Sequence, residues 1–185
     1  NLTACTMYQP PPSPKEAGGM AYQEGVPGGV MVNTVEVSAR VTAINTGERE
    51  VTLLASDGKK YPVKVGPEAV NFDQIRLGDL VKATVTEELM VYLEEAGTHA
   101  GEGAAGVVAL APKGAKPGGV VAHTTQVIAT VVAIDRAGRT ATLRFDDGET
   151  KTFPVRDDID LSRYDTGERV VFRHTEMIAI SVEKQ

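Results

Sequence analysis

The sequence is poor in the residues that most often build catalytic and metal sites. Its 185 residues include no Trp, one Cys and three His. A single Cys excludes an intrachain disulfide and a zinc site made of several cysteines. No apolar run approaches the roughly 18–20 residues that a membrane-spanning helix needs. Acidic residues outnumber basic ones, 25 against 19, and this balance argues against binding to a nucleic-acid backbone.

Glycine and proline, by contrast, are frequent. The chain has 19 Gly and 10 Pro, with 42% hydrophobic and 24% charged residues. This composition is typical of a soluble, turn-rich β protein. The length is sufficient for one ordinary domain or two small ones.

The first 26 residues predict a disordered tether. The chain begins at Asn1 rather than Met, and Leu2-Thr3-Ala4-Cys5 has the form of a lipobox. We expect Cys5 to be lipidated, which would be the only attachment to a membrane; the alternative is a free, exposed Cys. The Pro-rich segment 10–14 favours a stiff spacer over a docking ligand. The expected location is the periplasm or the outer membrane.

An internal repeat predicts the domain organisation. Pro27-Gly28-Gly29-Val30 recurs as Pro117-Gly118-Gly119-Val120, and about 15 of the 32 or so aligned positions that begin with this segment are identical. Tyr61-Pro62-Val63 aligns with Phe153-Pro154-Val155 if the second copy carries a two-residue insertion. The predicted domains are residues 27–95 and 117–185, joined by a Gly/Ala/Pro linker at 96–116.

Each copy predicts five strands and one helical turn. Alternating apolar and polar residues indicate the strands. Asp57-Gly58 and Asp147-Gly148 predict hairpin turns, with positive φ at both central residues. Thr86-Glu87 and Thr175-Glu176 occur at the same position in both copies, and each Glu is interpreted as a turn residue at a strand end. The strands are expected at 35–43, 50–54, 60–65, 80–87, 89–93, 125–134, 140–145, 151–155, 169–175 and 177–182, and the helical turns at 71–76 and 161–164.

This pattern predicts an all-β fold of two tandem small five-stranded OB-like barrels, with SH3-like barrels as the alternative. Closure would remove the exposed edges that so short a sheet could not protect. The fifth strands are apolar on both faces. They are predicted either to pack the two barrels together or, as the alternative, to form a partner-binding face. The interface residues are Leu89, Val91, Leu93, Ile178 and Ile180.

The second copy resembles a known kind of domain. Val131-Val132-Ala133-Ile134-Asp135, Thr142-Leu143 and Gly167-Glu168-Arg169-Val170 are similar to bacterial cell-envelope OB-like domains of unknown function. Their layout is also similar to that of the small periplasmic copper/silver-binding protein of efflux systems. The resemblance implies a barrel and an exported address. That family's metal site uses a His, a Trp and two Met, and segments 53–63 and 143–155 contain none of these residues.

Several residues remain as weaker candidates for chemistry. Met20, Met31, Met90 and Met177 are possible soft-metal ligands, although Met more often fills gaps in a core. His174 is interpreted as a core or rim residue. Asp157, Asp158 and Asp160 resemble a calcium loop without its spacing, so helix N-capping is the preferred interpretation. No nucleophile elbow or phosphate loop is present, and we predict no catalytic residue, metal or cofactor.

The sequence therefore predicts a non-enzymatic, exported bacterial envelope protein that acts as a binding or structural module. Envelope proteins are the expected partners, nucleic acid is not, and the oligomeric state is left open. A periplasmic soft-metal binder for copper or silver is the alternative. The third hypothesis is an enzyme that uses Glu87 or Glu176 as a general acid or base.

Overall fold

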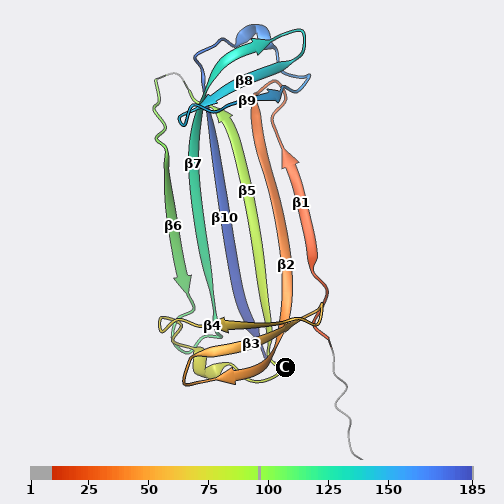
Figure 1. Ribbon diagram of the computed structural model, residues 1–185, viewed down its shortest axis with the longest axis vertical. Helices are drawn as coiled ribbons and strands as arrows, with labels where there is room; N and C mark the ends of the chain where they lie inside the picture. The colour runs from red at the N-terminus through yellow and green to blue at the C-terminus, as the bar shows by residue number, and fades with distance from the viewer. Residues whose placement is uncertain (1–9, 96, 185) are drawn as a thin grey trace, which may run out of the picture.

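The protein is all-β, as predicted. The computed structural model describes residues 10–95 and 97–184 and contains ten strands in a single antiparallel sheet (Figure 1). The strands are β1 Lys15–Ala21, β2 Gly28–Asn45, β3 Glu50–Ala55, β4 Lys60–Lys64, β5 Leu80–Leu93, β6 Gly103–Leu110, β7 Gly118–Asp135, β8 Thr140–Phe145, β9 Thr150–Pro154 and β10 Arg169–Glu183. Two short 3-10 helices, η1 Phe72–Gln74 and η2 Leu161–Arg163, lie within the predicted helical turns.

Four long strands form the centre of the sheet in the order β2-β5-β10-β7. Strands β1 and β6 lie outside them, against the first parts of β2 and β7. The second parts of β2 and β7 pair instead with β3 and β8, which continue to β4 and β9. Figure 1 shows the result, a long central sheet with one small cap at each end.

Two strands were missed in the sequence because their side chains show little alternation. Residues 15–21 form β1, so the prediction of a disordered tether is wrong for this segment. Residues 103–110 form β6, so the predicted linker is in part a strand. In both cases the free edge of a long neighbouring strand supplies the backbone partners, and backbone pairing does not depend on side-chain pattern.

The predicted fourth and fifth strands of each copy are one continuous strand. Glu87 lies in the middle of β5 and Glu176 in the middle of β10, so the prediction that they are turn residues is wrong. Neither site has the Gly, Pro or Asn that would end a strand. Each long strand is also paired along both edges, which holds the backbone extended through these residues.

The two halves of the chain join through the pairing of β5 with β10. Glu87 lies directly opposite Glu176, and the same register continues from Leu93 opposite Val170 to Leu80 opposite Glu183. Glu87 and Glu176 occupy matching positions in the two halves. The halves are therefore related by an approximate two-fold axis that passes between these residues, normal to the sheet.

Each cap has its own small core. A register shift between Val41 and Ala43 bends β2 into the first cap, and the same shift occurs in β7 between Val131 and Ala133. The first core consists of Val41, Val51, Phe72 and Ile75, and the second of Ala129, Val131, Leu143 and Val170. The sheet is open rather than closed. A barrel is not shown, and the prediction of two OB-like barrels remains unconfirmed.

The registers also correct the sequence alignment of the two copies. Glu50 pairs with Lys64 in the first cap, and Thr140 pairs with Pro154 in the second. Lys64 therefore corresponds to Pro154, and there is no two-residue insertion before Phe153. The shared Pro-Val pair misled the alignment, because hydrogen-bond register rather than residue identity determines which positions are equivalent.

The hairpin turns lie where Asp57-Gly58 and Asp147-Gly148 predict them. Only the glycines have positive φ, 81° at Gly58 and 85° at Gly148, so the expectation of positive φ at both central residues is wrong. The Asp57 carboxylate accepts from the Lys59 N–H at 2.9 Å, and this contact stabilises the turn. A three-residue loop with one left-handed Gly explains the geometry.

Each cap also holds a loop that leads into the long strand of the other half. In the second cap, Asp158 accepts from Gly25 N at 2.8 Å, and Arg156 Nη2 donates to the Val26 carbonyl at 2.8 Å. In the first cap, Asn71 donates to the Pro112 carbonyl at 2.9 Å. These reciprocal contacts connect the two halves beyond the β5–β10 pairing.

The central sheet is a single layer. Its strands make their main contacts with neighbours in the same sheet. The accessible surface is 12,032 Å², whereas a compact monomer of this mass would expose about 8,600 Å². The protein therefore exposes sheet faces and edges that most proteins bury.

Candidate functional site

One face of the central sheet is largely apolar, and we call it the apolar face. Directly opposed residues of antiparallel strands project from the same side, and alternate residues along each strand share that side. The registers therefore place the following residues on this face: Met31, Val35, Val37, Val85, Leu89, Val91, Phe172, Ile178, Ile180, Val121 and Val127.

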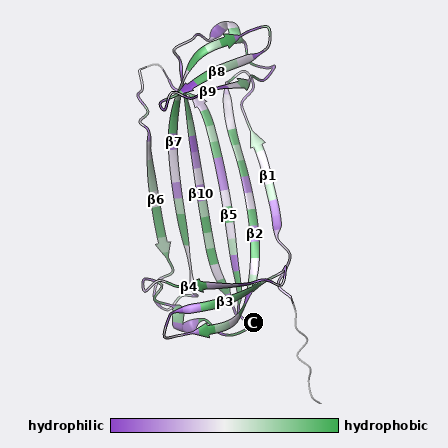
Figure 2. Ribbon diagram, viewed as in Figure 1, coloured by the Kyte–Doolittle hydropathy of each residue, from purple (hydrophilic) through white to green (hydrophobic). Residues whose placement is uncertain are grey.

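The apolar face is partly exposed along the sheet between the caps and buried where it enters them. Val37, Val121 and Ile180 are 39%, 46% and 46% exposed. Towards the caps the same face enters the two cores, because Val81 packs on the first core and Phe172 on the second. The face is thus an apolar surface with a folded cap at either end. Figure 2 shows hydrophobic and hydrophilic residues alternating along the central strands, as expected when the two faces of a sheet differ.

A polar row crosses the centre of the apolar face. Asn33 lies opposite Glu87, Glu87 opposite Glu176, and Glu176 opposite His123. Three members of the row are exposed and Glu176 is half-buried. Two carboxylates therefore lie side by side on the two-fold axis, a destabilising arrangement in a sheet unless something else compensates.

The predicted interface residues lie where the two halves join, but they do not contact each other as a pair of strands. Leu89, Val91 and Leu93 lie opposite His174, Phe172 and Val170. Ile178 and Ile180 lie opposite Val85 and Ala83. The second part of β5 thus pairs with the first part of β10, and the second part of β10 with the first part of β5. The reason is that the antiparallel register is centred between Glu87 and Glu176.

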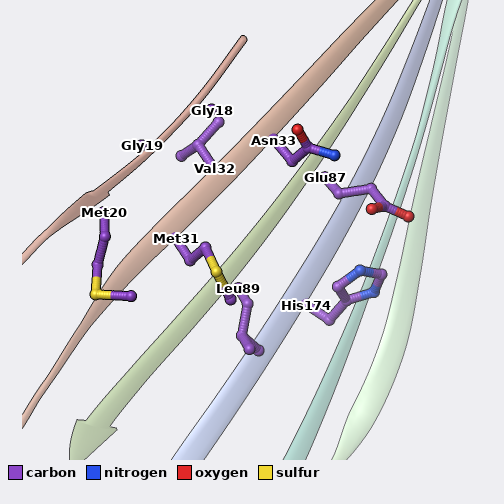
Figure 3. A pocket seen from close by; sticks show the side chains of 9 residues that line it. All are labelled: Gly18, Gly19, Met20, Met31, Val32, Asn33, Glu87, Leu89 and His174. Atoms are coloured by element: carbon purple, nitrogen blue, oxygen red, sulfur yellow. The ribbon is translucent and has the colours of Figure 1, made fainter. Parts of the chain in front are cut away.

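A shallow hollow on the apolar face brings together several residues from the first half and His174. Its volume is about 520 Å³, and Met20, Met31, Leu89 and His174 line it beside Glu87. Figure 3 shows Met31, Leu89 and His174 on three successive strands, with Asn33 and Glu87 in the next row. The hollow is open to solvent along the sheet, so it is a surface depression rather than an enclosed cavity.

The methionines divide between the two faces. Met20 lies directly opposite Met31 on the apolar face, whereas Met90 lies opposite Arg173 on the other face. The sequence alone did not bring Met20 and Met31 together, because β1 was not predicted. Among the described residues, no group of three or more His, Cys, Asp and Glu is arranged to hold a metal ion.

The acidic segment of the second cap has structural partners. Asp160 caps η2 by accepting from Ser162 N at 3.0 Å, as the N-capping interpretation predicts. Asp158 forms a two-point ion pair with Arg156, with Nε–Oδ1 at 2.9 Å and Nη2–Oδ2 at 3.1 Å. The Arg156 guanidinium and the Gly25 N–H lower the pKa of Asp158 to about 2. These side chains hold the cap and its loop in place.

Comparison with models of known protein families and with curated proteins found no match. Across residues 10–95 and 97–184, no helix has the length and hydrophobicity needed to cross a bilayer. Cys5, the predicted lipidation site, lies outside the described residues.

Proposed function

We propose that this chain is a non-enzymatic, exported envelope protein whose apolar face binds a partner protein. The observation that carries the proposal is the single-layer sheet, which leaves this face uncovered between two well-packed caps. An exposed apolar surface of this kind marks an interaction site in soluble proteins. The repeat in sequence is proposed to reflect an internal duplication that produced this face.

The acidic pair at the centre of the apolar face limits the chemistry of the partner. Glu87 and Glu176 would lose water contacts when the face is covered, and an unpaired buried charge is costly. A partner surface with apolar side chains around a central Lys or Arg would compensate both carboxylates. The same acids lie on an open face rather than in a cleft, which supports binding over acid-base catalysis.

Site-specific photo-crosslinking in the native envelope tests this proposal. A photoreactive residue at Val121 would project from the apolar face, and one at Ala122 would project from the opposite face of the same strand. We expect a discrete crosslinked envelope protein from position 121 and none from position 122. Equal crosslinking from both positions, or none from position 121, would contradict the proposal.

The proposed export and lipid anchor require a separate experiment. The full gene would be expressed in a bacterial host fed with a labelled fatty acid, alongside a Cys5→Ala variant. The label should enter the wild-type protein and be absent from the variant. An unlabelled wild-type protein would remove the anchor from the proposal and leave the binding face unaffected.

A soft-metal site is the second candidate, supported by the placement of Met20 opposite Met31 near His174. Thioether and imidazole ligands are suited to cuprous ion. Titration with cuprous ion against a competing chelator should show one site that the Met20→Leu/Met31→Leu variant loses. The matched control is Met90→Leu on the opposite face. Absence of uptake by the wild-type protein would exclude this candidate.

A further inference from the structure

The outer edge of the central sheet at β6 is unpaired and uncharged. In the described part of the chain β6 pairs only with β7, and all eight of its residues are exposed. Val107 and Val108, on opposite faces of this strand, are 66% and 64% exposed. A long, hydrophobic edge without charges or proline is a template for pairing with another strand.

The opposite edge of the sheet, at β1, has a different character. Lys15 and Glu16 place charges on it, whereas β6 carries none; both strands contain two glycines. Figure 2 shows the contrast, since β6 is hydrophobic along its length and β1 begins with hydrophilic residues. Of the two equivalent edges, only β6 lacks the charged side chains that prevent strand addition.

The chain already contains the type of contact that β6 could form. Strands β5 and β10 are equivalent strands of the two halves, and they pair antiparallel about a two-fold axis. A strand without charges can repeat this arrangement with its own copy, because no like charges are brought opposite each other.

We propose that two copies of this protein associate through antiparallel pairing of β6 with β6 of the second copy. The central sheet would then extend from six strands to twelve. The assembly closes as a dimer because each copy contributes its one uncharged edge and keeps β1 outward. The two-fold axis is normal to the sheet, so the apolar faces of both copies lie on the same side.

The size of this contact sets the expected affinity. Eight residues span about 26 Å, and an antiparallel pair of that length forms about eight backbone hydrogen bonds. Such an interface is at the lower end of the range for specific contacts, so a micromolar dissociation constant is expected. The net charge of -6 on each copy adds repulsion, and salt should therefore strengthen the dimer.

The proposal is tested by measuring the oligomeric state of the chain, without a lipid anchor, by analytical ultracentrifugation from about 1 µM to 1 mM. Val107→Lys and Val108→Lys each place a charge on the edge and should weaken the dimer at least tenfold. The matched control is Met20→Lys, because Met20 lies opposite Met31 in β1 just as Val108 lies opposite Val121 in β6. This variant should dimerise like the wild-type protein.

The pattern of variants distinguishes this dimer from other assemblies. A dimer through the apolar face would be weakened by Met20→Lys and Val108→Lys, which both lie on that face, and not by Val107→Lys. That pattern, a wild-type monomer at all concentrations, or species larger than a dimer would each overturn the proposal. Circular dichroism verifies that the variants keep the fold, and concentration-dependent protection of β6 amides from hydrogen exchange would directly support the pairing.

Discussion

Single residues at the caps stabilise loops that carry few apolar contacts. Arg49 and Arg139 occupy the same position in the two halves, with left-handed φ values of 52° and 50°. Arg49 Nη2 donates to the carbonyls of Gly66 and Ala69, both at 2.9 Å, and its guanidinium lies 4.6 Å from the centre of the Phe72 ring. The side-chain contacts of Arg49 therefore compensate for the cost of its backbone conformation.

Arg49→Ala should destabilise the protein by about 2 kcal/mol, because charged hydrogen bonds to the cap loop are lost. Arg49→Gly loses the same contacts, but Gly tolerates a left-handed φ, so it should be about 1 kcal/mol more stable than the Ala variant. Chemical denaturation measures both changes. Equal stability of the two variants would show that the backbone conformation at Arg49 carries no cost.

Asp158→Asn should loosen the loop 22–28, because the ion pair with Arg156 is lost and the contact with Gly25 weakens. We expect the Gly25 amide to exchange about tenfold faster with solvent. Asp157→Asn is the control, since the Asp157 side chain is fully exposed and forms an ion pair with Arg139 rather than with Arg156. Unchanged exchange at Gly25 in the Asp158 variant would contradict the assigned contact.

The lowered pKa of Asp158 predicts that the stability of the protein depends on pH. The pKa of Asp158 is about 2 in the folded protein, below its ordinary value of 3.8. Its contribution to stability is therefore complete above about pH 5 and decreases as the pH falls from there towards 2. Thermal unfolding between pH 6 and 2 should show a steeper loss for the wild-type protein than for Asp158→Asn. Parallel curves would contradict the lowered pKa.

At the level of elements, the long strands β5 and β10 carry an unfavourable pair of carboxylates, Glu87 and Glu176, at the centre of their pairing. Glu87→Gln should raise stability by about 0.5 kcal/mol at pH 7 and low salt, because it removes repulsion from Glu176. The gain should disappear near 1 M salt. Glu88→Gln is the matched control, because Glu88 lies opposite Thr175 on the other face. An equal gain in both variants would argue against the pair.

Strands β3, β4, β8 and β9 were predicted within one residue at each end, whereas β2 and β7 each begin seven residues before the predicted start. The errors have a common cause. Strand β3 and the Asp57-Gly58 turn follow from alternation and turn chemistry, which act over a few neighbouring residues. Strands β1 and β6 depend on a free edge supplied by another strand. The division of β5 at Thr86-Glu87 failed for a related reason, since long-range pairing keeps that segment extended.

The sequence predicted some residues of the candidate site but not how they are arranged. Leu89, Val91 and Ile178 were predicted from the sequence to be interface residues. Their partners could not be deduced, because a one-residue change of register would turn every side chain to the other face. The polar row and the hollow beside Met31 likewise exist only through the pairing of four strands from both halves.

At the level of the whole molecule, the two halves should unfold together. Strands β5 and β10 pair along their full length, and each cap holds a loop that precedes the other half's long strand. Val41→Ala in the first cap core and Val131→Ala in the second should each cost about 2 kcal/mol and lower the same single transition in calorimetry. Two separate transitions, each shifted by one variant, would show independent halves.

The sequence by itself determined that the protein is β-rich, where most strands begin and end, and that two similar segments follow one another. These features depend on side-chain alternation, on Gly and Pro in turns, and on residue identity, all of which are local. Only the tertiary structure decided that the segments share one open sheet, that Glu87 meets Glu176, and that an apolar face and the β6 edge remain uncovered. The reason is that backbone pairing joins strands far apart in the chain, and the register of that pairing is a property of the whole sheet.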